Sequence, residues 1–178
     1  MSIFSVPVLE TDRLIMHPHT VEDAEDVFQW TSDERVAEFM NYNRHESISD
    51  SIEWLKSLDT LENEYTWGIV RRQDGKLIGS CSIRRRPDGI FWSFGYNLRF
   101  DCWNKGYATE AAKRMIEFVK KEHNAVKITA EHAVDNPASG RVMEKCGMHF
   151  VRYGEYSSFD GKRKYRSAVY EMDGGENE

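Results

Sequence analysis

The chain has 178 residues, of which 40% are hydrophobic and 30% are charged, and its formal net charge at pH 7 is −6. This length suits one domain with a core of its own, and the composition excludes a disordered or fibrous protein. The acidic excess disfavours non-specific binding to nucleic acid, which depends on Lys and Arg, and slightly favours a cationic partner.

No apolar run approaches the roughly 18 residues that a membrane span requires. The N-terminal MSIFSVPVLETDR also lacks the basic and then apolar plan of a signal peptide. The three cysteines, Cys81, Cys102 and Cys146, are scattered and odd in number, which suits reduced thiols rather than disulfides. We therefore expect a cytoplasmic protein that does not bind a membrane.

The first half of the chain predicts a strand, three helices and a meander of strands. Residues 13–20, RLIMHPHT, are typical of a strand, and Thr20 with Asp23 is a candidate capping box for the helix that follows. Apolar residues at helical spacing predict that helix, a short second one over residues 36–40 and a third over residues 48–61. Strands follow at 65–72, 76–86 and 90–99, and the Asp-Gly turns between them predict an antiparallel meander.

The second half alternates helices and strands. Residues 108–123 carry an apolar stripe at helical spacing, and residues 126–134 alternate as a strand does. Residues 135–147 predict a shorter helix, with Asn136 placed to cap it and Gly147 at its end. A hairpin follows over residues 149–172. We expect one α+β domain over residues 1–172, with a mixed, mostly antiparallel sheet of about seven strands flanked by helices, and a disordered acidic tail at 173–178.

The stretch CWNKGYATEA, residues 102–111, places a single glycine where the long helix begins. Unpaired N–H groups at a helix start attract anions, and Gly106 would let the backbone approach a phosphate because no Cβ atom stands in the way. One glycine before a helix is most often a plain turn, however, and neither GxxxxGK[ST] nor GxGxxG is present. These residues alone leave both interpretations open.

Three stretches in combination resemble the GCN5-related N-acetyltransferases (GNAT). They are ETDRL at 10–14, WNKGYATEA at 103–111, and NPAS at 136–139 followed by EKCGMHF at 144–150. The resemblance covers nearly the whole chain and is closest to the branch that contains the ribosomal-protein N-terminal (Rim-type) acetyltransferases. It implies a single GNAT-like domain with acetyl-CoA as the acetyl donor and no metal.

The resemblance also implies which residues bind the cofactor. Backbone N–H groups from Asn104 to Thr109 would bind the CoA pyrophosphate, and Leu98 and Arg99 would pair their backbone with the pantetheine arm. Asn136 would hydrogen-bond that arm or the backbone beside it. The expected cofactor-binding residues are Leu98, Arg99, Asn104, Lys105, Gly106, Tyr107, Ala108, Thr109, Asn136 and Ser139. Phe100 stands where the family usually has proline, which leaves the shape of the loop open.

Transfer to an amine needs a group that takes a proton from the amine and a group that stabilises the departing thiolate. The family's usual tyrosine for the thiolate is replaced here by Met143, and the resemblance to Rim-type members points instead to Ser139. Their usual glutamate base is replaced by Ser93. Glu131, five residues before Asn136, is the remaining candidate base, although a solvated strand carboxylate is an equally good interpretation.

The resemblance therefore implies an acetyl-CoA-dependent N-acetyltransferase that acts by direct transfer on a primary amine, either a protein N-terminus or a small molecule. The protein would be a monomer or a homodimer. The alternative is a CoA-binding module that has lost catalysis, which Ser93 and Met143 favour and Ser139 disfavours. Cys102 adjoins the loop, but no histidine and carboxylate accompany it as a cysteine nucleophile requires. The run Arg84–Arg86 is more typical of a solvated hairpin tip than of a nucleic-acid site.

Overall fold

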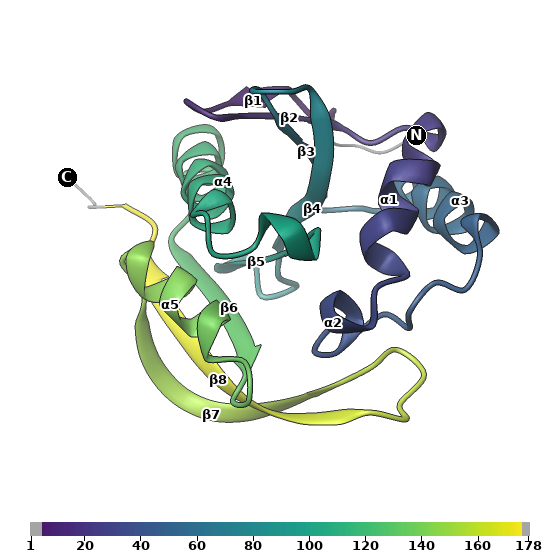
Figure 1. The fold of residues 1–178 in the computed structure, drawn as a ribbon. Helices are drawn as coiled ribbons and strands as arrows, with labels where there is room; N and C mark the ends of the chain where they lie inside the picture. Colours follow the sequence, from purple (N-terminus) through teal and green to yellow (C-terminus); the bar gives the residue numbers. More distant parts are fainter. Residues whose placement is uncertain (1–4, 176–178) are drawn as a thin grey trace.

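The computed structural model describes residues 5–175 and forms one eight-stranded sheet with helices on both of its faces (Figure 1). The strand order is β1-β2-β3-β4-β5-β6-β8-β7. The strands are β1 (Leu9–Glu10), β2 (Leu14–Pro18), β3 (Glu64–Arg71), β4 (Lys76–Arg85), β5 (Phe91–Leu98), β6 (Lys127–Ala133), β7 (His149–Ser157) and β8 (Lys164–Asp173). The predicted α+β fold with a mixed sheet is confirmed, and β1, with only two residues, adds an eighth strand to the seven expected.

The helices also follow the predicted order. They are α1 (Ala24–Thr31), α2 (Glu34–Ala37), α3 (Ile48–Ser57), α4 (Tyr107–His123) and α5 (Pro137–Lys145), with 3₁₀ turns at Val21–Asp23, Leu58–Thr60 and Phe100–Cys102. The Asp23 carboxylate accepts the Thr20 N–H at 3.0 Å, as in the predicted capping box. Across residues 5–175, no helix has both the length and the apolar character needed to cross a bilayer.

Alternation along the central strands gives the sheet an apolar core on each face. Ile78 on β4 is fully buried in the large core that includes the stripe of α4, whereas its neighbour Leu77 packs into a smaller core with α1 and α3. The predicted stripe of α4 is buried as expected, with Ala111 and Met115 at 0% exposure. Helices α4 and α5 therefore lie on one face of the sheet, and α1 and α3 lie on the other (Figure 1).

The sheet opens between β5 and β6, its one parallel pair among the described strands. These strands pair only where both begin, with Phe91 opposite Lys127 and Ser93 opposite Thr129. Beyond this point β5 continues to Leu98 beside β4, while β6 continues to Ala133 beside β8. The facing backbone edges of β5 and β6 are thus free of each other over their last residues.

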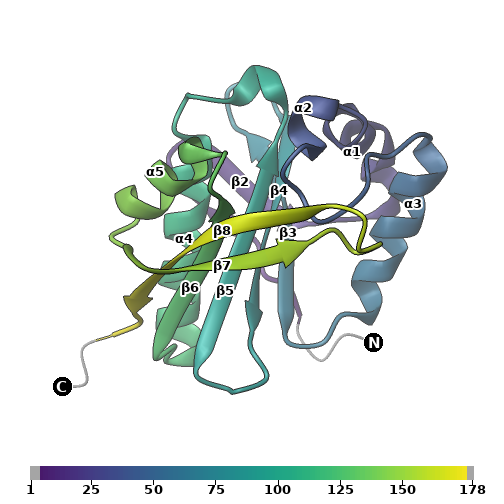
Figure 2. The same cartoon turned by 90° about the horizontal axis from the view of Figure 1, so that it is seen from below.

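The hairpin of β7 and β8 extends across the sheet towards α1–α3 (Figure 2). The Tyr156 and Tyr165 hydroxyls donate to the carbonyls of Phe39 and Glu38. Strand β8 reaches Asp173, so regular structure enters the predicted acidic tail. The last three residues of that tail, 176–178, lie outside the described residues, as do residues 1–4 of the predicted domain.

Candidate active site

The loop between β5 and α4 passes twice through left-handed backbone, at Asn104 (φ 58°) and Gly106 (φ 81°). Gly106 is the N-cap of α4, and its carbonyl accepts the first helical hydrogen bond from the Glu110 N–H at 3.1 Å. The N–H groups of Gly106–Thr109 therefore have no partner inside the helix. Together with the helix dipole, they form a place where an anion can bind.

Arg13, the residue immediately before β2, makes hydrogen bonds to this loop and to the first turn of α4. Its Nη1 donates to the Lys105 carbonyl at 2.9 Å, and its Nε donates to the Glu110 carboxylate at 3.1 Å. The guanidinium also lies 4.4 Å from the centre of the Tyr107 ring. A Cβ atom on Gly106 would come within 3.2 Å of Arg13 Nη2, so the glycine leaves room for the arginine as well as for the left-handed turn.

These groups fit a phosphate or pyrophosphate. Lys105 adds a positive charge to this loop, and the charge of Arg13 is largely offset by its ion pair with Glu110. The Tyr107 side chain is buried, so that residue can offer its backbone but not its phenol to a ligand. Asn104 and Lys105 are exposed, and Ala108 and Thr109 are half-buried.

The end of β5 presents backbone to the opening. The Arg99 N–H donates to the Ile78 carbonyl on β4 at 2.8 Å, so the neighbouring Leu98 directs its own N–H and C=O away from β4. The Leu98 carbonyl accepts the Trp103 indole N–H at 3.0 Å. Because the Arg99 N–H is already used within the sheet, a ligand that pairs with this edge has Leu98 as its partner.

Ser139 lies across the opening from β5 and meets a residue that the sequence did not single out. Its Oγ is 2.9 Å from the Tyr96 hydroxyl, which joins the first turn of α5 to the free part of β5. Burial raises the pKa of Tyr96 to about 12, although the bond with Ser139 opposes this shift. The phenol is therefore neutral throughout the ordinary pH range and acts as a hydrogen-bonding group.

Asn136 occupies the N-cap of α5, but its side chain makes no cap hydrogen bond, which corrects the prediction that it caps the helix. Its backbone N–H donates to the Ala133 carbonyl at 2.8 Å. The helix sits close to β6 because Gly140 lies against His132, where a Cβ atom would come within 2.7 Å of the imidazole. This contact fixes the first turn of α5, and Asn136 and Ser139 with it, beside the opening.

Glu131 lies on the other face of β6 from His132, which is buried. The glutamate is exposed, and one of its oxygens accepts a 2.8 Å hydrogen bond from Ser167 on β8. Asn97 on β5 lies on the same face of the sheet as Glu131. Its amide donates to the Tyr42 hydroxyl at 3.3 Å, and its Oδ1 atom is buried without a hydrogen bond. Ser139 and Glu131 are thus separated by the sheet and approach the opening from opposite faces.

Met143 and Cys102 are buried in the protein core. Met143 is 2% exposed within the large core, which accounts for an apolar residue at this position of α5. Burial raises the pKa of the Cys102 thiol, and the thiol is 1% exposed, so it is not presented as a nucleophile. Within residues 5–175, no three Cys, His, Asp or Glu side chains come together as a metal site requires.

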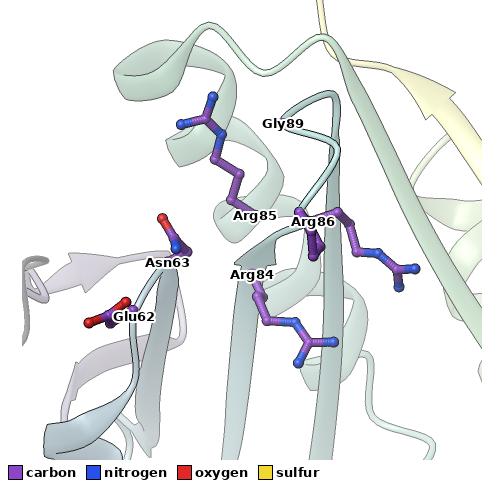
Figure 3. Close-up of a pocket in the computed structure, with 7 residues that line it drawn as sticks. Glu62, Asn63, Arg84, Arg85, Arg86 and Gly89 are labelled. Carbon is purple, nitrogen blue, oxygen red and sulfur yellow. The ribbon is translucent and has the colours of Figure 1, made fainter.

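A separate pocket lies at the β4–β5 hairpin, at the end of β5 away from the glycine loop. Its lining includes the basic run Arg84, Arg85 and Arg86 together with Glu62 and Asn63 (Figure 3). Figure 3 shows the three guanidinium groups pointing in different directions, so they do not converge on one anion. This arrangement agrees with the interpretation of the run as a solvated hairpin tip.

The sequence predicted no site role for Arg13 or Tyr96, although Arg13 lies in a family motif and Tyr96 lies in a predicted strand. Arg13 belongs to ETDRL, and Tyr96 belongs to WSFGYNL, where it interrupts an otherwise buried alternation of Trp92, Phe94 and Leu98. A polar hydroxyl on the apolar face of a strand indicates a nearby partner. That pattern was the available signal for Tyr96, whereas the contacts of Arg13 depend on tertiary structure.

Sequence and structure comparisons relate this chain to known proteins. A family profile described as an acetyltransferase (GNAT) domain matches residues 13–149. The chain is 31% identical over 175 residues to YoaA of Bacillus subtilis (strain 168), named as an uncharacterised N-acetyltransferase, and the match covers 93% of this chain and 96% of that protein.

Solved structures share the fold. A putative ribosomal-protein-serine acetyltransferase from Vibrio cholerae superposes with a TM-score of 0.79 at 17% identity, covering 93% of this chain and 97% of that one. A spermidine N-acetyltransferase from Vibrio cholerae, in complex with CoA and spermine, superposes with a TM-score of 0.75 at 18% identity, covering 92% of this chain and 96% of that one.

Proposed function

Because this chain belongs to the GNAT family and is an acetyl-CoA-dependent N-acetyltransferase, we propose that it transfers the acetyl group directly to a primary amine at the opening between β5 and β6. The observation that carries the proposal is the meeting of three features at this opening. They are the free N–H groups at the start of α4, the Leu98 backbone that is directed away from β4, and the hydroxyl of Ser139 across from them.

The chain's own residues divide the binding work. The N–H groups of Gly106–Thr109, with Asn104, Lys105 and Arg13 around them, would hold the pyrophosphate. The N–H and C=O of Leu98 would pair with the pantetheine arm as an added strand does. The side chain of Asn136, which makes no cap hydrogen bond in α5, would hydrogen-bond the same arm. The backbone N–H of Arg99, which was expected to pair with this arm, already donates to β4. Only its side chain, ion-paired with Asp101 at 3.0 Å, could still contact the cofactor.

The catalytic residues would act from the two faces of the sheet. Bound acetyl-CoA supplies a thioester with an electrophilic acetyl carbon and a thiolate leaving group. Ser139 would donate a hydrogen bond to the sulfur from the side of α5. An acceptor amine, with a pKa near ~8 for an α-amino group or ~10.4 for a lysine, must lose a proton first. Glu131 would take that proton, directly or through water, from the opposite side.

The acceptor would be a protein N-terminus or a small amine, and we place the chain in the Rim-type branch. Support comes from the named neighbours, since one is a putative ribosomal-protein-serine acetyltransferase and another acetylates spermidine. The net charge of −6 suits acceptors that arrive as cations. The alternative, a CoA-binding module without catalysis, draws on the apolar Met143 and on Ser93, which replaces a glutamate.

A thermal-shift experiment tests the cofactor assignment. Acetyl-CoA at 100 times its Kd should stabilise the protein by about 2.7 kcal/mol, or roughly 5–10 °C in Tm. Gly106→Glu should abolish the shift, because the side chain and its negative charge occupy the anion site. Gly89→Glu is the matched control, since Gly89 also has a positive φ of 72° but lies at the opposite end of β5. A shift that survives in Gly106→Glu would contradict the assignment.

An acceptor screen tests the transfer itself. Peptides with free N-termini, polyamines and aminoglycosides are incubated with acetyl-CoA, and the release of free thiol is measured. Release with any of these amines supports the enzyme and identifies the acceptor class. A protein that shows the thermal shift but releases no thiol with the whole panel would favour the binding module.

A further inference from the structure

Tyr96 and Ser139 form a hydroxyl pair at the opening between β5 and β6, with their oxygens 2.9 Å apart. Both side chains are half-buried, and they come from the two elements that face each other there. Each hydroxyl has one proton to donate, and the bond between them uses one of the two. The pair therefore retains one proton for a third atom.

The direction of the bond decides which residue keeps that proton. A phenol is the more acidic of the two groups and the better donor, whereas an aliphatic hydroxyl oxygen is the better acceptor. Tyr96 then donates to Ser139 Oγ, and the seryl proton is directed elsewhere. A hydroxyl that accepts one hydrogen bond also donates a stronger one, because bonds in a chain polarise each other.

We propose that Tyr96 is a positioning residue for the leaving group, because its phenol donates to Ser139 and turns the seryl proton towards the sulfur of bound CoA. The inference rests on the proposed function, which brings the sulfur to Ser139. It gives β5 a part in the chemistry, because a residue of that strand orients the proton donor on α5.

The acidities limit the pair to hydrogen bonding. The pKa of Tyr96 is about 12, and an ordinary thiol has a pKa of about 8.5. Complete transfer of the phenolic proton to the thiolate is therefore disfavoured by more than about a thousandfold. As the N–C bond forms and the C–S bond breaks, the electron pair of the C–S bond stays on sulfur, and the pair stabilises that charge without losing a proton. The amine's proton leaves by the base or by water.

The test uses binding of CoA, whose free thiol reproduces the leaving group, and of S-methyl-CoA, whose thioether sulfur cannot ionise. Affinities are measured by calorimetry at pH 6.5 and pH 9. A donor aimed at the sulfur favours the thiolate, so the wild-type affinity for CoA relative to S-methyl-CoA should rise about five- to tenfold between these pH values, since a hydrogen bond to a charged group is worth that much or more. The methylated ligand corrects for protein groups that titrate over the same range.

A double-mutant cycle separates positioning from a structural role. Tyr96→Phe should reduce the pH-linked gain to about threefold, and Ser139→Ala should remove it. Adding Tyr96→Phe to Ser139→Ala should change nothing further, because Tyr96 acts through the serine. Tyr65→Phe is the control, since it removes a tyrosine hydroxyl that lies 2.8 Å from His123, at the C-terminal end of α4, and should keep the full gain.

Each outcome bears on a separate claim. A wild-type gain that Tyr96→Phe leaves unchanged, or a loss that persists in the Ser139→Ala background, overturns the positioning role. Equal pH profiles for CoA and S-methyl-CoA in the wild type overturn the hydrogen bond to sulfur and leave the proposed function standing. Failure of the wild type to bind either ligand overturns the proposed function itself. If Tyr96→Phe does not fold, a pH-linked gain that survives in Ser139→Ala still overturns the positioning role, because Tyr96 acts through the serine.

Discussion

Arg13 and Glu131 illustrate two ways in which single residues are placed at this site. Arg13 bonds to Lys105, 92 positions away in the sequence, and in doing so fixes the loop whose backbone would bind phosphate. Glu131 is placed by strand alternation alone, which directs it away from α5, and Ser167 then holds one of its oxygens at 2.8 Å. The position of Arg13 thus depends on tertiary contacts, whereas the direction of Glu131 follows from the two-residue alternation of its strand.

Glu131→Gln tests the general base. If the carboxylate takes the amine's proton, the variant should lose about 10²-fold or more of kcat/KM. Acetyl-CoA binding should be unchanged, because the residue lies on the face opposite Ser139. The measurements are kcat/KM with the amine found in the acceptor screen and the Kd of acetyl-CoA.

The control for this prediction is Glu155→Gln, which alters an exposed carboxylate on β7. Its neighbour Tyr156 contacts the carbonyl of Phe39, so strand alternation turns Glu155 away from that surface. A Glu131→Gln variant with the wild-type kcat/KM would mean that water, or an amine already deprotonated when it binds, suffices for the reaction.

At the scale of elements, the β7–β8 hairpin and the segment between α2 and α3 hold each other in place. The Arg163 guanidinium donates to the carbonyls of Ala37 at 3.2 Å and Tyr42 at 2.7 Å, and to the Tyr165 hydroxyl at 2.9 Å. Tyr42 in turn contacts Asn97 on the face of β5 opposite α4. The hairpin thus fixes the side of the opening from which we expect the acceptor to approach.

Arg163→Ala should therefore lower the free energy of unfolding by roughly 2 kcal/mol, about the value of one hydrogen bond from a charged donor, because the side chain is half-buried and water replaces part of what is lost. It should also raise the KM for the acceptor more than the Kd for acetyl-CoA. Urea unfolding and steady-state kinetics measure the two effects. Lys162→Ala removes the adjacent positive charge without these bonds, and an equal effect of the two variants would contradict the role of the hairpin.

The sequence predicted the elements because their signals are local. Helical spacing located α4, and the Asp-Gly turns located the meander of β3, β4 and β5. The sequence did not predict that β5 and β6 separate, because this depends on how many residues of two distant strands pair with each other. Nor did it predict the contact of Tyr156 with Phe39, whose residues are 117 positions apart. Asn136 has the residue type of a cap, yet its side chain makes no cap bond, since residue type gives a preference and not a contact.

Over the whole molecule, acidic groups respond to folding in two opposite ways. Hydrogen bonds from Arg71 lower the pKa of Asp74 to about 2, and hydrogen bonds from Ser158, Lys162 and Asn43 lower that of Asp160 to about 2. Burial instead raises the pKa of Glu64 on β3, against the opposing charge of Arg84. The two aspartates favour the folded state when ionised, whereas Glu64 favours it when protonated.

The sign of the pH dependence follows from these shifts. As pH falls from 7, Glu64 takes up its proton at a pH above its ordinary value of 4.5, which removes the cost of its buried charge, so its own contribution to the free energy of unfolding should rise. Burial lowers the pKa values of His45 and His123, and these two groups act in the opposite direction because the unfolded chain takes up their protons first. Below about pH 4 the unfolded chain protonates its aspartates near 3.8, and the contribution of Asp74 and Asp160 is then lost as pH falls towards 2. The free energy of unfolding is measured with urea at intervals from pH 7 to pH 2 for the wild type, Glu64→Gln and Asp160→Asn. Relative to Glu64→Gln, the wild type should gain stability as pH falls from 7 towards 4, whereas its difference from Asp160→Asn should change only below about pH 4. A Glu64→Gln profile that runs parallel to that of the wild type between pH 7 and pH 4 would contradict the role of Glu64.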